Sequence, residues 1–259
     1  MSASLYESHV TVRCADPDEW VRLQRWAASG GLKLTHIVLA RGRMRDQPML
    51  TLSGSSSYVE QAERVRDVVA GLRADGFEPV RVKTESTPWA AEVPARLGGD
   101  DERYFEHHVK LLLDAGTDLA ALAARVVPHG AHLSWNALRV RAGARHERFV
   151  TQRCRGVGAD GAGRALEQLL RELGGFVVLG VEREFVLYDS DLSVDDGWIA
   201  EPVGVRRWVG RHGTDSAGGA PSCPGNRWTR SPAVHRTCLR RCSGWQGTTW
   251  CSVPSSTRR

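Results

Sequence analysis

Two histidine–glutamate pairs are the residues of this chain best suited to chemistry. His9 and Glu85 lie 76 positions apart, and His108 and Glu184 have the same separation. Imidazole and carboxylate groups in contact can form an ion pair or act as a general acid and base, and two such pairs together can ligate a divalent metal ion. The repeated spacing predicts one histidine–glutamate pair that is present twice.

The equal spacing belongs to a longer internal repeat with an offset of 99 residues. Segment 6–14 (YESHVTVRC) resembles segment 104–114 (YFEHHVKLLLD). Further matches in the same register are Tyr6 with Phe105, Glu7 with Glu106, Val82 with Val181, and the Gly-Phe pair at 76–77 with that at 175–176. Matches held in one register over this length indicate an internal duplication.

Each copy has the pattern of a strand, a helix, two strands, a helix and a strand. Polar and apolar residues alternate over 7–14, and Asp16 and Pro17 favour the start of a helix that Gly30 ends. In the first copy, strands are expected at 32–40, 49–53 and 77–85 and a second helix at 57–75; the order repeats from residue 104. This order predicts two tandem ferredoxin-like α+β domains.

The composition divides the chain into four parts. We predict a first ferredoxin-like repeat at 1–86, a linker rich in proline, glycine and acids at 87–103, and a second repeat with a C-terminal extension at 104–202. Residues 203–259 hold ten arginines, no lysine, one acid and four of the six cysteines, with no apolar period. They are predicted to form a disordered tail, read in a frame other than the native one.

Charge and hydropathy argue against two classes of binding partner, nucleic acids and membranes. Residues 1–202 hold 25 basic and 29 acidic residues, which argues against a nucleic-acid surface in this part of the chain. The chain has no run of 18 apolar residues and no basic-then-apolar N-terminus, so we predict a cytoplasmic protein without a membrane partner.

The free faces of the two predicted sheets are where binding would take place. Helices cover one face of each ferredoxin-like sheet, and the polar faces left over would line a cleft between the copies. We predict a non-catalytic binding or regulatory protein that recognises a small anionic ligand or a protein partner there, with no cofactor and no metal ion. The predicted ligand-binding residues are His9, Arg81, Lys83, Glu85, His108, Lys110, Ser134 and Glu184. The simplest alternative is an ordinary polar surface that faces water.

Two short motifs indicate a different function. His9-Val10-Thr11-Val12 and His132-Leu133-Ser134-Trp135 resemble the H-x-T-x and H-x-S-x motifs of the two-histidine phosphoesterases. The resemblance implies that one histidine acts as a base and the other as an acid, while Thr11 and Ser134 hold the phosphate. The internal repeat instead pairs His9 with His108, whose motif has Lys110 in place of the hydroxyl residue. Whether the protein is an enzyme therefore stays open from the sequence.

RNA binding across open sheets is a third function to consider. RNA recognition of that kind uses exposed aromatic side chains on the central strands. The corresponding positions here carry histidine, threonine and lysine. The sequence favours the other two functions.

Overall fold

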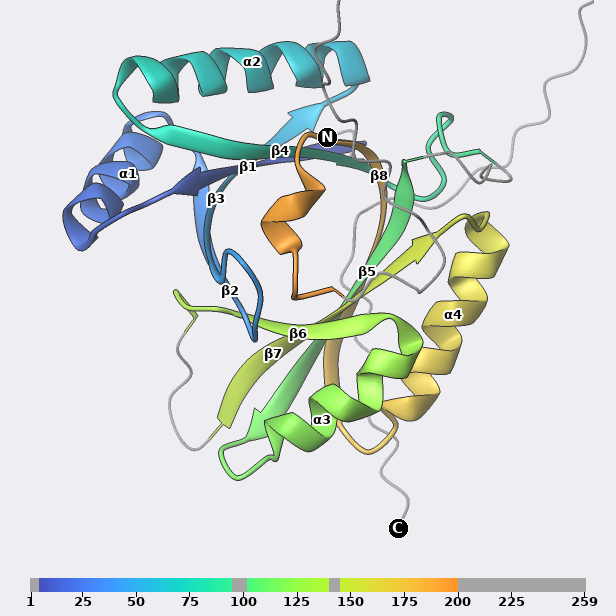
Figure 1. Ribbon diagram of the computed structural model, residues 1–259. Helices are drawn as coiled ribbons and strands as arrows, with labels where there is room; N and C mark the ends of the chain where they lie inside the picture. The colour runs from blue at the N-terminus through green and yellow to red at the C-terminus, as the bar shows by residue number, and fades with distance from the viewer. Residues whose placement is uncertain (1–4, 95–101, 140–144, 200–259) are drawn as a thin grey trace, which may run out of the picture. The chain divides into compact units, whose positions relative to one another are not determined.

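The computed structural model describes residues 5–94, 102–139 and 145–199, which belong to one compact unit. Their eight strands form a closed antiparallel barrel (Figure 1). The first half comprises β1 (Tyr6–Arg13), α1 (Pro17–Ser29), β2 (Lys33–Leu39), β3 (Asp46–Ser55), α2 (Tyr58–Ala74) and β4 (Glu78–Ser86). The second comprises β5 (Tyr104–Asp114), α3 (Leu119–Val126), η1 (Val127–His129), β6 (Ala131–Asn136), β7 (Arg145–Arg155), α4 (Ala159–Glu172), β8 (Val177–Asp189) and η2 (Leu192–Asp195). The predicted tail at 203–259 and part of the predicted linker, 95–101, lie outside the described residues.

The prediction of two tandem ferredoxin-like α+β domains is wrong, because the strands of both halves belong to one barrel. The strand order around the barrel is β1-β3-β2-β6-β7-β5-β8-β4, and β4 pairs with β1. Residues 37–39 of β2 pair with 134–136 of β6, and 83–86 of β4 pair with 185–189 of β8. In two separate sheets these four strands would be edges with unpaired backbone groups. Pairing between the halves satisfies those groups and closes the barrel.

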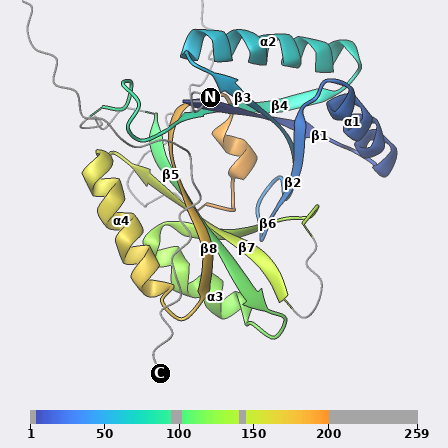
Figure 2. The ribbon, with the colours of Figure 1, turned by 180° about the vertical axis from the view of Figure 1, so that it is seen from behind.

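The four helices lie outside the ring of strands, as both ribbon views show (Figures 1 and 2). Asp16 caps α1 by accepting a hydrogen bond from the Glu19 backbone at 2.8 Å, and Ser57 caps α2 in the same way. Apolar cores fill the space between the helices and the barrel wall. In the first half they include Val10, Val12, Leu23, Leu50 and Leu72, and in the second Val109, Leu111, Leu122, Val150 and Leu166. Complete burial of each such side chain contributes about 1.5–3 kcal/mol to folding.

The opposite face of the same strands is polar and points into the barrel. Side chains alternate between the two faces of a strand, so the neighbours of the core residues face inward. On β4 these are Arg81, Lys83 and Glu85, and on β5 they include Glu106 and His108. The polar faces that were predicted to line a cleft between two separate domains are therefore enclosed by one barrel.

A short segment after β8 returns into the ring of strands, where Figure 1 shows η2. The backbone of Arg43 donates a hydrogen bond to the Asp196 carbonyl at 2.7 Å, and the Trp198 indole donates to the Leu133 carbonyl at 2.9 Å. The close approach depends on Gly42, whose φ is +116°, because a Cβ there would lie 3.0 Å from the Trp198 Cβ. Residues 190–199 thus join the β2–β3 turn to the second half.

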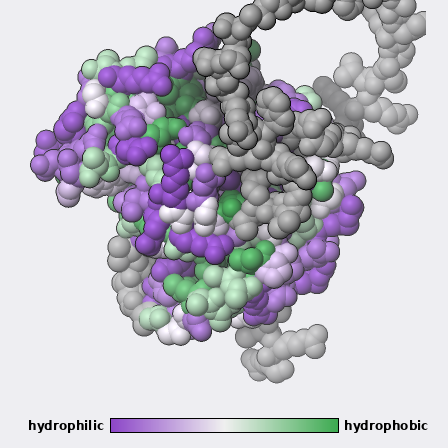
Figure 3. All heavy atoms as spheres, viewed as in Figure 1, coloured by the Kyte–Doolittle hydropathy of each residue, from purple (hydrophilic) through white to green (hydrophobic). Residues whose placement is uncertain are grey.

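Hydrophilic residues cover most of the face seen in Figure 3, and hydrophobic ones lie in small patches. Among the described residues, no helix is both long enough and apolar enough to cross a membrane. The charged residues of β4 and β5 described above lie inside the barrel.

Candidate functional site

Each half of the barrel places one histidine between two glutamates and a threonine. In the first half, Nε2 of His9 lies 3.2 Å from Oε2 of Glu85 and 3.4 Å from Oε1 of Glu7. Its Nδ1 lies 3.1 Å from Oγ1 of Thr51. The pairing of β1 with β3 and β4 explains this set, because Glu7 is directly opposite Glu85 and His9 is directly opposite Thr51. We call these four residues the first constellation.

The second half repeats the arrangement, and we call it the second constellation. Nε2 of His108 lies 3.1 Å from Oε1 of Glu106 and 3.3 Å from Oε2 of Glu184. Its Nδ1 lies 2.9 Å from Oγ1 of Thr151. In both constellations the threonine fixes the orientation of the ring, so that Nε2 is aimed at the carboxylates.

Lys83 connects the two constellations across the junction of β4 and β8. Its ammonium lies 2.6 Å from Oε1 of Glu106 in the second half, and it also contacts Oε1 of Glu85 in the first half. The side chains of both glutamates are almost completely buried. His9 and His108 are therefore the ends of one continuous chain of contacts.

Two arginines extend this chain toward η2. Arg153 contacts Oε2 of Glu106 at 2.5 Å and Oδ2 of Asp195 at 2.7 Å. Arg81 lies 2.8 Å from the same Asp195 oxygen and makes a two-pronged contact with Asp189 at 2.8 and 2.5 Å. Gln47 donates to the other oxygen of Asp195 at 2.9 Å. Asp195 is the point where β3, β4 and β7 meet the returning segment.

The charges of this interior network balance only when both histidines are protonated. Five carboxylates with side-chain exposures between 1% and 22% face three permanently charged cations, which leaves an excess of two negative charges when the histidines are neutral. The network is defined by Glu85, Glu106, Glu184, Asp189 and Asp195, by Arg81, Lys83 and Arg153, and by His9 and His108. Buried charges are costly without compensation, so the excess must be met by protons or by a bound cation.

The pKa shifts favour the protonated form of both histidines, which meets this excess. Burial alone would lower the pKa of His108, but Glu184 and Glu106 outweigh it and hold that pKa well above its usual value. The pKa of His9 is also raised, because Glu85 outweighs the effect of burial. Burial and the nearby Glu85 raise the pKa of Glu184 to about 7. In contrast, Arg153 and Lys83 overcome burial and keep the pKa of Glu106 well below its usual value.

Six of the eight residues predicted from the sequence as ligand-binding belong to this network: His9, Arg81, Lys83, Glu85, His108 and Glu184. The other two lie elsewhere in the barrel. Lys110 pairs with Glu147 at 2.6 Å, and Ser134 is buried on β6. Their role in binding stays a prediction.

The two histidines of the phosphoesterase-like motifs lie on β1 and β6, with β3 and β2 between them in the barrel. Thr11 and His132 are both buried, and the ring of His132 lies 6.2 Å from that of Trp198. Burial, together with Arg41 and Arg153, lowers the pKa of His132 to about 4. The barrel brings His9 into a network with His108, and it gives His132 a different environment.

Sequence reasoning missed several members of the site. Glu106 could have been found, because it matches Glu7 at the offset of 99 and both precede a histidine by two residues. Asp189 and Asp195 fall in the acidic extension after the second repeat, where no periodic pattern places them. Arg153 was not among the predicted site residues, and its partners come from β5 and η2, which are far from it in the sequence.

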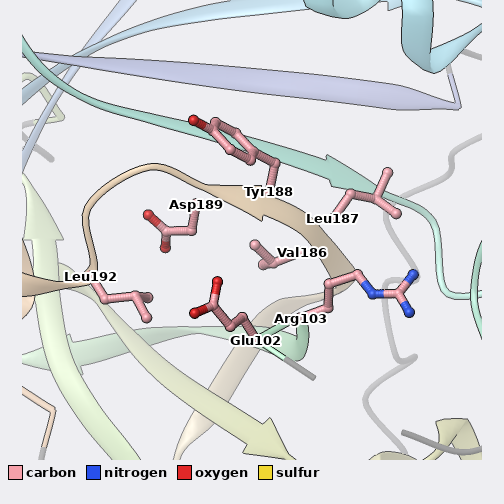
Figure 4. Close-up of a pocket in the computed structure, with 7 residues that line it drawn as sticks. All are labelled: Glu102, Arg103, Val186, Leu187, Tyr188, Asp189 and Leu192. Atoms are coloured by element: carbon pink, nitrogen blue, oxygen red, sulfur yellow. The ribbon is translucent and has the colours of Figure 1, made fainter. Parts of the chain in front are cut away.

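A pocket of roughly 400 Å³ adjoins the network beside β8. Figure 4 shows the carboxylates of Asp189 and Glu102 on the same side as Leu192, while the guanidinium of Arg103 points away from them. Asp189 belongs to both the pocket and the network, because its carboxylate also contacts Arg81. The pocket therefore reaches a charged residue of the interior network.

No protein-family model matches the chain, and no curated protein matches it either.

Proposed function

We propose that this protein is a non-catalytic binding protein that holds a small cation in the acid-rich interior of its barrel. The observation that carries the proposal is the charge excess of the interior network. Five largely buried carboxylates face three permanent cations, and both histidines lie against the acids. A bound cation would compensate the buried negative charge without the protons that the network otherwise needs.

The arrangement of the cationic residues favours a cation over the anion expected from the sequence. Lys83 already contacts Glu85 and Glu106, and Arg81 already contacts Asp189 and Asp195. An anion would have to displace two carboxylates from either residue. A cation would replace only a proton, or move one ammonium group.

A binding role agrees better with the site than catalysis does. General acid–base work requires a titrating group within reach of a substrate. The rings of His9 and His108 are each held at both nitrogens by residues of the barrel. The pocket beside β8 supports access to the network, because Asp189 and Leu192 line it.

The test is a comparison of cations with anions on the full-length protein. Thermal unfolding and titration calorimetry would be run with ammonium, methylammonium and putrescine, and with phosphate, sulfate and acetate at matched ionic strength. We expect the cations to raise the melting temperature and the anions to leave it unchanged. Stabilisation by the anions alone would contradict the proposal.

A pair of variants locates the effect. Glu85→Gln removes one interior negative charge, so cation binding should weaken about tenfold. Glu147→Gln is the matched control, because Glu147 is also buried but pairs with Lys110 outside the network. Equal losses in the two variants would place the binding site elsewhere.

A further inference from the structure

Within this proposed function, we infer that Glu106, His108 and Glu184 form a binding site for one divalent metal ion of the Mn²⁺ type. The inference rests on the proposal that the interior holds a cation and names the chemical class of that cation. It also differs from the prediction made from the sequence, which was a binding site without a metal ion.

The donor atoms are close enough together to share one ion. One atom from each of Glu106, His108 and Glu184 lies within 4.8 Å of the other two. A metal ion with ligand bonds of about 2.0–2.3 Å can bridge atoms at such separations. One imidazole nitrogen with two carboxylate oxygens suits a divalent ion of borderline hardness.

The groups around the donors hold them as metal ligands are usually held. A ligating histidine commonly donates its second ring N–H to an oxygen, which fixes the tautomer and leaves the other nitrogen for the metal. Oγ1 of Thr151 lies 2.9 Å from Nδ1 of His108 and can accept that bond. Arg153 holds the second oxygen of Glu106 at 2.5 Å.

One oxygen of the group has a long contact. Oε2 of Glu184 is inaccessible to solvent, and its ion pair with Nε2 of His108 spans 3.3 Å. Ligand bonds to a divalent ion are shorter, at about 2.0–2.3 Å. A metal ion between Glu184 and His108 would therefore give this oxygen a closer partner.

Lys83 occupies part of the position that the metal would take. Its ammonium lies 2.6 Å from Oε1 of Glu106 and also contacts Glu85. When the ion binds, the ammonium of Lys83 would lose its contact with Glu106 and retain its contact with Glu85. The positive charge of Lys83 would then be paired with the first half alone. Metal binding would also release protons, because ligating imidazole and carboxylate groups must be deprotonated.

The first constellation is less suited to a metal. Glu7, the counterpart of Glu106, has a side chain that is 41% exposed, against 1% for Glu106. Within residues 5–94, 102–139 and 145–199, the group in the second half is the one that brings three such donor atoms within 4.8 Å of one another. The internal repeat therefore provides a control site of the same composition.

The experiment is a titration of the full-length protein with Mn²⁺, followed by electron paramagnetic resonance of the free ion and by calorimetry in two buffers. Mn²⁺ is the probe because residues 203–259 contain four cysteines, which would bind Zn²⁺ but have little affinity for manganese. We expect one ion per chain, with proton release that appears as a buffer-dependent heat. His108→Ala and the isosteric Glu184→Gln should each weaken binding at least tenfold, and His9→Ala should change it less than twofold.

Each result is decisive. Absence of Mn²⁺ binding, or a larger loss in His9→Ala than in His108→Ala, would overturn the metal site. Two ions per chain, one lost with each histidine, would overturn its assignment to the second half. If Mn²⁺ fails while putrescine or methylammonium still binds, the inference fails and the proposed function stands. If neither binds, the proposed function fails with it.

Discussion

The two constellations have the same residue types, with the histidines and glutamates 99 residues apart and the threonines 100 apart, yet their surroundings differ. Glu7 lies at a position where its side chain is 41% exposed, and it contacts His9. Glu106 is 1% exposed and contacts His108, Lys83 and Arg153. At the offset of 99, Lys83 corresponds to Glu182, and in the strand pairing Ser53 stands opposite Glu7 where Arg153 stands opposite Glu106. The cations around Glu106 are therefore not duplicated.

The difference shows that the internal repeat supplies the histidine and glutamate side chains of each constellation, whereas closure of the barrel determines the charges and the burial around them. Closure brings Lys83 from the first half onto Glu106 of the second, and the segment after β8 adds Asp195. One of two equivalent sites thereby becomes the centre of a buried network. Three changes test this comparison in order of decreasing effect.

The largest effect is expected from Glu106→Gln. This change removes a buried carboxylate that compensates Lys83 and Arg153, and breaking a buried ion pair on one side typically costs about 3–5 kcal/mol. The free energy of unfolding, measured by urea denaturation, should fall by about that amount. Glu7→Gln is the matched change, and it should cost less than about 1 kcal/mol because its ion pair is exposed. Equal costs would show that the two halves are energetically equivalent.

A smaller effect is expected from Asp195→Asn, which weakens the attachment of η2. Arg81 would still pair with Asp189, and Arg153 would still pair with Glu106, so each cation would retain one ion pair. Loss of the charge-assisted hydrogen bonds should cost about 2 kcal/mol. Hydrogen–deuterium exchange should accelerate in residues 190–199 and remain unchanged in α1 and α2. Unchanged exchange in 190–199 would mean that Asp195 does not hold the segment.

The pH dependence should be the smallest of the three effects. The pKa values of His9, His108 and Glu184 are raised in the fold, so their protonated forms stabilise it at low pH and the contribution is lost as pH rises through the folded values. Glu85 and Glu106 have lowered pKa values and stay ionised over this range. The histidines should lower the free energy of unfolding by about 1–2 kcal/mol between pH 6.5 and 9, whereas the contribution of Glu184 is lost between its unfolded pKa of about 4.5 and its folded pKa of about 7.

The two histidines should contribute unequally to that pH dependence. The pKa of His108 is raised further than that of His9, so His108→Gln should remove more of the slope than His9→Gln. Denaturation curves collected at four or five pH values would show the difference. A slope above pH 7 that survives both changes would contradict its assignment to the histidines.

The positions of the elements along the chain could be predicted from the sequence, since local signals determine them. Asp16 and Pro17 were expected to begin a helix, and α1 begins at Pro17. Alternation placed Val10 and Val12 against the helices, where the apolar core contains them. Such signals depend on a few neighbouring residues.

Closure could not be predicted, because the same alternation describes a sheet whose polar face meets water and one whose polar face lines a barrel. The pairing of β2 with β6 and of β4 with β8 depends on contacts between residues about 100 positions apart. The charges of the two copies indicated in part that the halves would meet. The first copy has two cations on one strand, Arg81 and Lys83, and the second copy has two acids, Glu106 and Glu184. These opposite charges are complementary across the junction between the halves.

The most direct test of the account is an anomalous difference map from crystals of the full-length protein equilibrated with Mn²⁺. We expect one peak within bonding distance of Nε2 of His108 and of the carboxylates of Glu106 and Glu184, with the ammonium of Lys83 moved toward Glu85. A peak at Glu7, His9 and Glu85, or an interior without any peak, would contradict the claim that the barrel encloses a cation site in its second half.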